Sequence, residues 1–123
     1  RSLRTIDMVQ QTYRPQDTEV TLLMVLPDQM HIDGQFARDR MARKAAQELE
    51  TFAALLPGWT VRTELLWGSP GPEIVYYARE RGFDALVMTR SSRGPLQKLG
   101  SVATYVVRNA QFLDLIIMRE AAP

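Results

Sequence analysis

Four short apolar runs, separated by segments in which apolar residues recur at helical spacing, constrain the fold of this chain more than any other feature. The apolar runs cover residues 20–26, 61–67, 85–88 and 113–118, and the helical segments cover residues 3–13, 41–56, 72–82 and 100–110. Strict alternation of helices and strands favours a parallel sheet joined by right-handed crossovers. The sequence therefore predicts an α/β fold with a doubly wound parallel sheet, and 123 residues suit a single domain over residues 1–123.

The strand runs differ in how far they predict burial. Residues 20–26 are apolar except for Thr21, which is typical of a strand covered by helices on both faces. Residues 61–67 alternate instead, with Val61 and Thr63 on one face and Arg62 on the other, and this pattern indicates a strand nearer the sheet edge.

The chain opens on a helical segment that has no strand before it. In a βαβ alternation each helix follows a strand, so we expect a first strand, central in the sheet, to be missing ahead of Arg1. Its absence would leave a gap that the other four strands must close.

Composition removes several classes of function. The chain has no Cys and one His, so thiol nucleophiles, disulfides and Cys-based zinc sites are excluded, and the lone His31 is interpreted as a surface residue. The net charge of +1 argues against nucleic-acid binding. No apolar run approaches the roughly 18–20 residues that span a bilayer, so we expect a cytoplasmic protein without membrane contact.

Residues 83–107 have the layout of a phosphate site. An apolar strand leads through a basic, glycine-containing loop into a helix that opens on Gly100 and Ser101, and no carboxylate occurs between Asp84 and Asp114. Backbone N–H groups at a helix start attract anions. Two simpler interpretations stay open: Ser101 is only a helix cap, and the loop is an ordinary solvated loop.

Several segments resemble the universal stress protein family over nearly the whole chain. They are residues 19–27 (EVTLLMVLP), 65–70 (LLWGSP), 83–89 and 100–110 (GSVATYVVRNA), of which the last is the most specific. The resemblance implies an adenine-nucleotide alpha-hydrolase-like fold, a role in stress response or regulation, and homodimers that pair through Leu113 to Met118.

Nucleotide-binding members of that family carry the loop G-x2-G-x9-G-[S/T], and this chain departs from it. Thr89 and Ser92 stand where the first two glycines are expected, and seven residues rather than nine separate Ser92 from Gly100. The resemblance places phosphate contacts at the helix start and base contacts on two strands. The candidate ligand-binding residues are Val25, Met88, Arg90, Ser91, Ser92, Arg93, Gly100, Ser101 and Val102.

Because the loop is short and poor in glycine, we expect weak or absent ATP binding, with a phosphate or sulfate site near Ser101. Val25 and Met88 are also interpreted as core residues. A basic cluster in the long helix is interpreted as its solvated face. It comprises Arg38, Arg40, Arg43 and Lys44.

The leading hypothesis is a small regulatory protein that acts by dimerisation and by binding a phosphate-bearing ligand, without turnover, catalytic residues, metal or a required cofactor. One alternative is a weak ATP-binding or ATP-hydrolysing enzyme, although no carboxylate near the basic loop is available to hold a metal. Another is a ligand-free module that binds an unknown protein partner.

Overall fold

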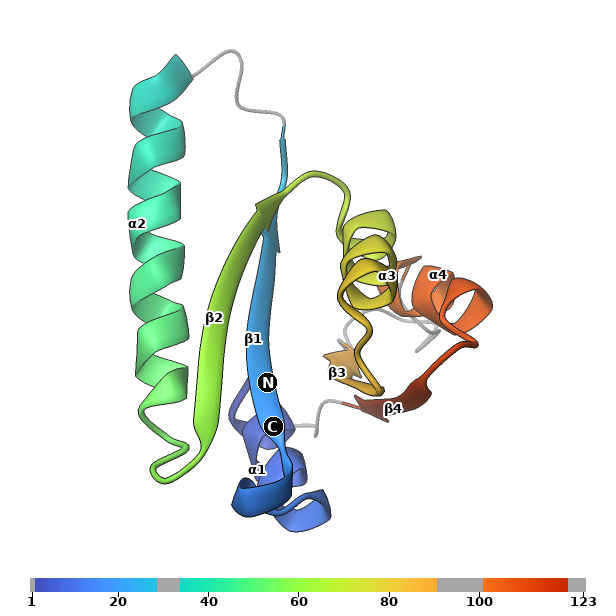
Figure 1. Cartoon of the computed structure of the whole chain (residues 1–123). Coiled ribbons are helices and arrows are strands. Elements are labelled where there is room, and N and C mark those ends of the chain that lie inside the picture. The colour runs from blue at the N-terminus through green and yellow to red at the C-terminus, as the bar shows by residue number, and fades with distance from the viewer. Residues whose placement is uncertain (1, 29–33, 91–100, 120–123) are drawn as a thin grey trace.

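The computed structural model describes residues 2–28, 34–90 and 101–119, and helices and strands alternate along them as predicted. The elements are α1 (Ser2–Thr12), a 3-10 turn (Pro15–Asp17), β1 (Glu19–Leu26), α2 (Gly34–Ala53), β2 (Thr60–Trp67), α3 (Pro70–Arg81), β3 (Ala85–Arg90), α4 (Ser101–Asn109) and β4 (Asp114–Arg119). Figure 1 shows their arrangement.

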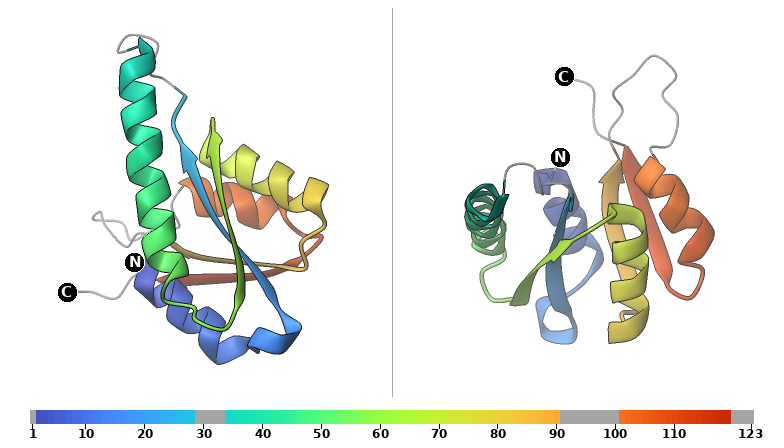
Figure 2. Two further views of the ribbon diagram at one scale, coloured as in Figure 1. Left: turned by 60° about the vertical axis from the view of Figure 1, so that its left-hand side comes forward. Right: turned by 90° about the horizontal axis from the view of Figure 1, so that it is seen from above.

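The four strands form two separate parallel pairs rather than one sheet. β1 pairs with β2, from Glu19 opposite Thr60, and β3 pairs with β4, from Ala85 opposite Asp114. Within residues 2–28, 34–90 and 101–119, no ladder joins β1 to β3. The strands of the two pairs also run at an angle to each other (Figure 2). Strand direction was thus predicted correctly, and the four strands do not close the gap expected between them.

Helices cover both sides of these strands. α2 packs against β1 and β2, and α1 packs against α2 and β3. On the other side α3 and α4 pack against each other, and α3 also contacts β1. Figure 2 shows α3 and α4 together beside β3 and β4, away from α2. This is the layering of a doubly wound α/β fold.

The buried core comes from the helices and the turns that follow them. The apolar residues that are fully buried in the described part of the chain are Ile6, Ala45, Leu49, Leu56, Val75, Ala78, Ala103, Val106 and Ala110. Val75, Val106 and Ala110 form one cluster, and Leu86 and Met88 of β3 pack against it only partly buried. Helices α2 and α3 contact β1 from opposite sides, as predicted for residues 20–26, although these residues are only half-buried.

The residues that end α3 set where β3 begins. As predicted, Pro72 lies in the first turn of the helix and Gly82 directly follows its last residue, Arg81; Gly82 has φ 69° and ψ 37°. The Phe83 N–H donates to the Ala78 carbonyl at 3.1 Å and closes the last turn. A glycine in the left-handed region is the usual helix end.

Two local predictions need correction. α2 starts at Gly34, seven residues before the apolar pattern at Met41, because its first turn faces solvent and leaves Phe36 71% exposed. In β2 the alternation fails: Thr63 is exposed and Glu64 is half-buried. The Tyr77 hydroxyl of α3, 3.4 Å from Glu64 Oε2, draws that carboxylate inward.

Candidate functional site

The carboxyl ends of β1 and β2 are tied together by one arginine. Arg38 of α2 places Nη1 2.8 Å from Asp28 Oδ1, and its guanidinium carbon lies 4.4 Å from the ring centre of Trp67 at the end of β2. A guanidinium over an indole face gains cation–π stabilisation. Arg38 is thus a tether between three elements and not only part of a solvated helix face. The interpretation of the basic cluster as a solvated helix face is confirmed for Arg40, Arg43 and Lys44, which are exposed.

A tight turn leads from β2 into α3. The Gly68 N–H donates to the Leu26 carbonyl at 2.9 Å, and Gly68 has φ 143°. A Cβ added at Gly68 would lie 2.9 Å from Cγ and Oε1 of Glu73. The Glu73 carboxylate therefore sits over the turn that opens α3, where the positive end of the helix dipole favours a negative charge. A further anion is disfavoured at this helix start.

The start of α4 differs from that of α3 in charge. α4 has no acidic residue in its first turn, and Ser101 is exposed. Val102 packs against the Val75, Val106 and Ala110 cluster, which holds the helix start in place. Because the first turn of α4 has no acidic residue, its backbone N–H groups have no carboxylate partner within that turn.

The structure places only some of the candidate ligand-binding residues. Arg90 is the last residue of β3, opposite Arg119 in β4. The candidates outside the described residues are Ser91, Ser92, Arg93 and Gly100. The phosphate-binding loop therefore stays a prediction. The structure describes the elements on either side of it, β3 and α4.

The two predicted base contacts lie in different sheets. Val25 is in β1 opposite Leu66, whereas Met88 is in β3 and packs against the buried core. Met88 also lines a cavity between β1 and β3, and Val25 is not among the residues that line it. This placement agrees with the interpretation of Val25 and Met88 as packing residues. One ligand could contact both residues only if it reached from the β1–β2 sheet to the β3–β4 sheet.

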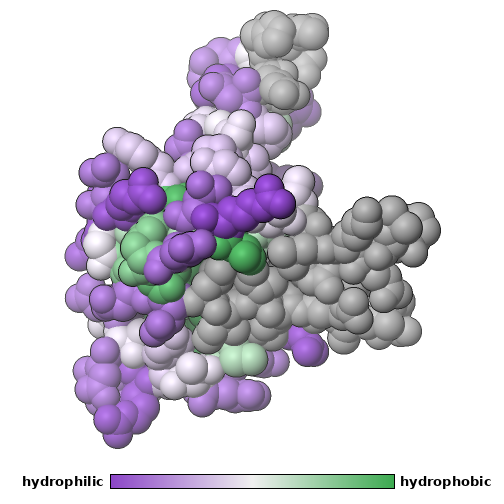
Figure 3. All heavy atoms as spheres, turned by 90° about the vertical axis from the view of Figure 1, so that its right-hand side faces the viewer, coloured by the Kyte–Doolittle hydropathy of each residue, from purple (hydrophilic) through white to green (hydrophobic). Residues whose placement is uncertain are grey.

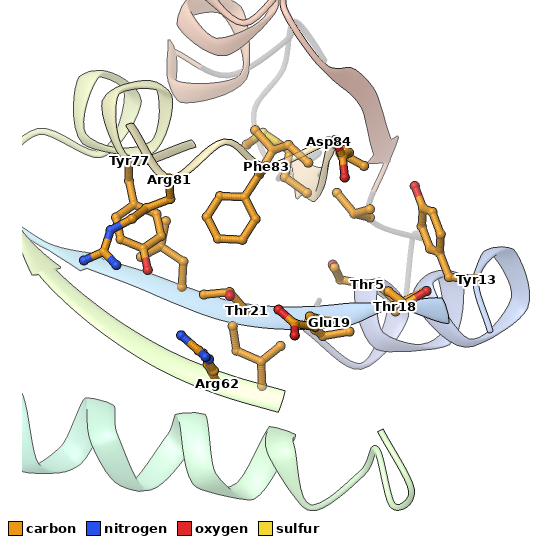
Figure 4. Close-up of a pocket in the computed structure, with 18 of the residues that line it drawn as sticks. Thr5, Tyr13, Thr18, Glu19, Thr21, Arg62, Tyr77, Arg81, Phe83 and Asp84 are labelled. Atoms are coloured by element: carbon orange, nitrogen blue, oxygen red, sulfur yellow. The ribbon is translucent and has the colours of Figure 1, made fainter. Parts of the chain in front are cut away.

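A cavity of about 800 Å³ separates β1 from β3. Its long walls are residues 19–24 along β1 and residues 84–88 along β3. α1 contributes Ile6 and Val9, and α3 contributes Ile74. Figure 4 shows side chains from α1, β1, β2 and the end of α3 around this space. The residues that line this cavity were not predicted from the sequence.

One wall of the cavity is an aromatic and charged group at the end of α3. The Tyr77 and Phe83 rings stack at 5.6 Å, and the Arg81 guanidinium lies 5.3 Å from the Tyr77 ring centre. Burial raises the pKa of Tyr77, and the nearby Glu64 carboxylate raises it further, while Arg81 and Arg62 oppose the shift. Tyr77 is therefore held as a neutral hydrogen-bond donor.

Within the described ranges, no helix has the length and apolar character needed to cross a membrane. The same residues contain no group of three or more His, Cys, Asp or Glu side chains that could hold a metal ion.

The alternating order, the parallel strand pairs and the helices on both sides define a doubly wound α/β protein with a candidate site at the strand ends. The model of the universal stress protein family matches residues 1–118, and the chain belongs to that family.

Individual relatives agree with this assignment. The universal stress protein MJ0531 of Methanocaldococcus jannaschii is 36% identical over 64 residues, which are 50% of this chain and 38% of the relative, so the match spans well under half of that protein. The solved structure of hypothetical protein MJ0577 matches with a TM-score of 0.81 and 21% identity, covering 98% of this chain and 89% of the other. Hypothetical protein PH0823 gives a TM-score of 0.72 and 22% identity with the same coverage. The fold class is thereby confirmed.

Proposed function

We propose that this protein serves in stress response and acts without turnover, by binding a phosphate-bearing ligand at the start of α4 and by associating with a second copy through β4. The observation that carries the ligand site is the contrast between two helix starts. Glu73 occupies the first turn of α3, whereas the first turn of α4 has no acidic residue and presents an exposed Ser101. An anion is favoured at a helix start only where no carboxylate already fills it.

The basic side of the site comes from the segment between β3 and α4. In the sequence, Arg90 and Arg93 flank Ser91 and Ser92. No carboxylate occurs between Asp84 and Asp114. Metal-assisted phosphoryl transfer needs carboxylates beside the phosphate. This composition supports binding rather than hydrolysis, and an assay of ATP hydrolysis with Mg²⁺ tests the enzyme alternative.

Titration calorimetry at moderate salt tests the ligand. We expect inorganic phosphate to saturate the protein at millimolar concentration and ATP to bind no more tightly. Ser101→Glu places a carboxylate on the α4 start and abolishes the phosphate heat. Gln47→Glu adds the same charge at an exposed position of α2 and leaves the heat unchanged.

Two results would contradict this reading. Low-micromolar ATP affinity that Ser101→Glu abolishes would establish a nucleotide site despite Thr89 and Ser92. A melting temperature that neither phosphate nor any nucleotide raises would favour the ligand-free interaction module.

Self-association is proposed through the outer edge of β4. β4 pairs only with β3 in the part of the chain that the structure describes, and an unpaired edge strand invites pairing with another chain. Phe112, two residues before β4, is an exposed apolar side chain, with 45% of its surface accessible. Figure 3 shows an apolar patch bordered by hydrophilic residues on the side of the molecule that lies to the right in Figure 1.

Light scattering at micromolar concentration tests this association. We expect a dimer for the unaltered chain and a shift toward monomer for Phe112→Ser. Phe36→Ser removes an even more exposed aromatic from α2, away from β4, and leaves the dimer intact. A monomer at micromolar concentration in the unaltered chain would contradict the proposal.

A further inference from the structure

The outward face of α2 divides by charge. Three exposed basic side chains lie in its amino-terminal half, and two exposed carboxylates lie in its carboxyl-terminal half. They are Arg40, Arg43 and Lys44, followed by Glu48 and Glu50. Within the described residues none of these five side chains forms an ion pair. The face therefore has one positive and one negative end.

This order of charges does not stabilise the helix itself. A helix dipole favours acidic residues in the first turn and basic residues in the last, and α2 has neither. Lys44 and Glu48 have the spacing of an intrahelical ion pair, yet they do not form one. Asp39, in the amino-terminal half, accepts a hydrogen bond from Gln35 Nε2 at 2.8 Å instead of pairing with a basic neighbour. The charges of this face are therefore available to a partner outside the helix.

Helix geometry places these charges on one stripe with apolar ends. At about 3.6 residues per turn, positions separated by alternating steps of four and three lie on one face. The exposed residues with this spacing are Phe36, Arg40, Arg43, Gln47, Glu50 and Ala54. The Ala54 N–H donates to the Glu50 carbonyl at 3.0 Å, so helical geometry continues to the last of them. The buried Ala45 and Leu49 face the opposite way, toward the strands.

Two copies of this stripe are complementary when the helices are antiparallel. A two-fold axis level with Ala45 sets each position opposite the one that lies equally far on the other side of Ala45. Arg40 then faces Glu50 of the partner subunit, and Arg43 faces Gln47 of the partner subunit. Phe36, which is 71% exposed, lies opposite Ala54 of the partner subunit and beside its neighbour in sequence, the 39% exposed Leu55. Charge and apolar surface are matched along the whole stripe.

Other occupants are less complementary to the stripe. A surface of one charge sign, such as an anionic membrane, attracts one half of the stripe and repels the other. A parallel second copy sets Arg40 against Arg40 and Glu50 against Glu50, and like charges in contact oppose binding. The antiparallel copy brings opposite charges together at both ends.

We propose that α2 is a second self-association surface, at which two copies pair as antiparallel helices about a two-fold axis level with Ala45. α2 lies on the side of the molecule away from β3 and β4 (Figure 1), so this contact and the proposed β4 contact use different faces. Two isologous contacts on one chain link dimers into larger assemblies. The contact uses neither β4 nor the start of α4, so it stands apart from the proposed function.

The size of the stripe sets the strength of the contact. From position 36 to position 54 the stripe is about 27 Å long at about 1.5 Å per residue, and a helix is about 10 Å wide. Such a face is much smaller than the roughly 800 Å² per partner of a standard interface. We therefore expect dissociation constants on the order of hundreds of micromolar, above the micromolar range in which β4 pairing is tested.

Sedimentation equilibrium from micromolar to millimolar concentration tests the contact. At low salt we expect the average mass of the unaltered chain to rise by about half or more over this range, and to rise less at high salt, which screens exposed charges. Phe36→Ser should reduce the rise and Phe112→Ser should not, whereas at micromolar concentration only Phe112→Ser lowers the mass. A constant mass overturns the proposal without touching β4 pairing. Co-sedimentation with phosphatidylserine vesicles at constant mass would likewise overturn it, in favour of a lipid surface.

Charge reversal tests the pairing of Arg40 with Glu50. Arg40→Glu and Glu50→Arg should each prevent the rise in mass, because each sets like charges opposite one another. An equimolar mixture of the two variants should restore the rise, and so should the double variant, since opposite charges then face each other again. Glu80→Arg reverses an exposed carboxylate of α3 and should leave the rise unchanged. If the mixture or the double variant fails to restore the rise, or if the single variants associate like the unaltered chain, the proposal is wrong.

Discussion

Truncating Val106 is the most direct test of how α4 is oriented. Val106 is completely buried in the cluster with Val75 and Ala110, whereas Val107, the next residue of the same helix, is 41% exposed. Val106→Ala removes two buried carbons, which costs about 1.6 kcal/mol in transfer free energy at roughly 0.8 kcal/mol each. The remaining cavity raises the loss to about 2–3 kcal/mol.

This loss converts to a temperature through the entropy of unfolding. At roughly 2.1 cal/mol/K per residue, a chain of this length unfolds with an entropy of about 0.26 kcal/mol/K, so we expect the melting temperature to fall by about 8–12 °C. Val107→Ala is the matched control, because both substitutions exchange the same residues in the same helix and share any gain in helix propensity.

Differential scanning calorimetry of the two variants measures the difference directly. We expect Val107→Ala to change the free energy of unfolding by less than about 0.5 kcal/mol. Equal losses in the two variants would mean that α4 does not present Val106 inward. The start of α4, and with it the proposed phosphate site, would then be wrongly oriented.

Three further predictions concern substitutions of single residues. Gly82→Ala should lower the free energy of unfolding by about 1 kcal/mol in urea titrations, because a left-handed backbone disfavours a Cβ, and Gly82→Asn should lose less. Burial and Glu64 raise the pKa of Tyr77 above its ordinary value of 10.0, so the folded chain keeps a proton that the unfolded chain releases. The stability advantage over Tyr77→Phe should therefore be complete below pH 10.0 and be lost as pH rises through the higher folded pKa, measured by urea unfolding at stepped pH. Arg38→Ala should cost about 1 kcal/mol and Arg38→Lys less, since Lys keeps the charge beside Asp28 but not the planar stacking on Trp67.

Periodicity predicted most of the fold because it records which face of each element is covered. The spacing of apolar residues predicted a helix over residues 100–110, and its Val102 and Val106 pack in the core. The start of α2 was not predicted because its first turn does not pack against the rest of the protein. Phe36 is exposed there, so no apolar repeat marks the helix. Local patterns predict an element only where that element is packed.

Long-range pairs were beyond the same reasoning. Arg38 and Trp67 are 29 positions apart in the chain, and nothing in either segment signals that the guanidinium lies over the indole. The half-burial of Glu64 has the same origin, since Tyr77 is contributed by a different element. The candidate phosphate site at the start of α4 could be predicted from sequence because its features, a glycine, a serine and an absence of carboxylates, are local.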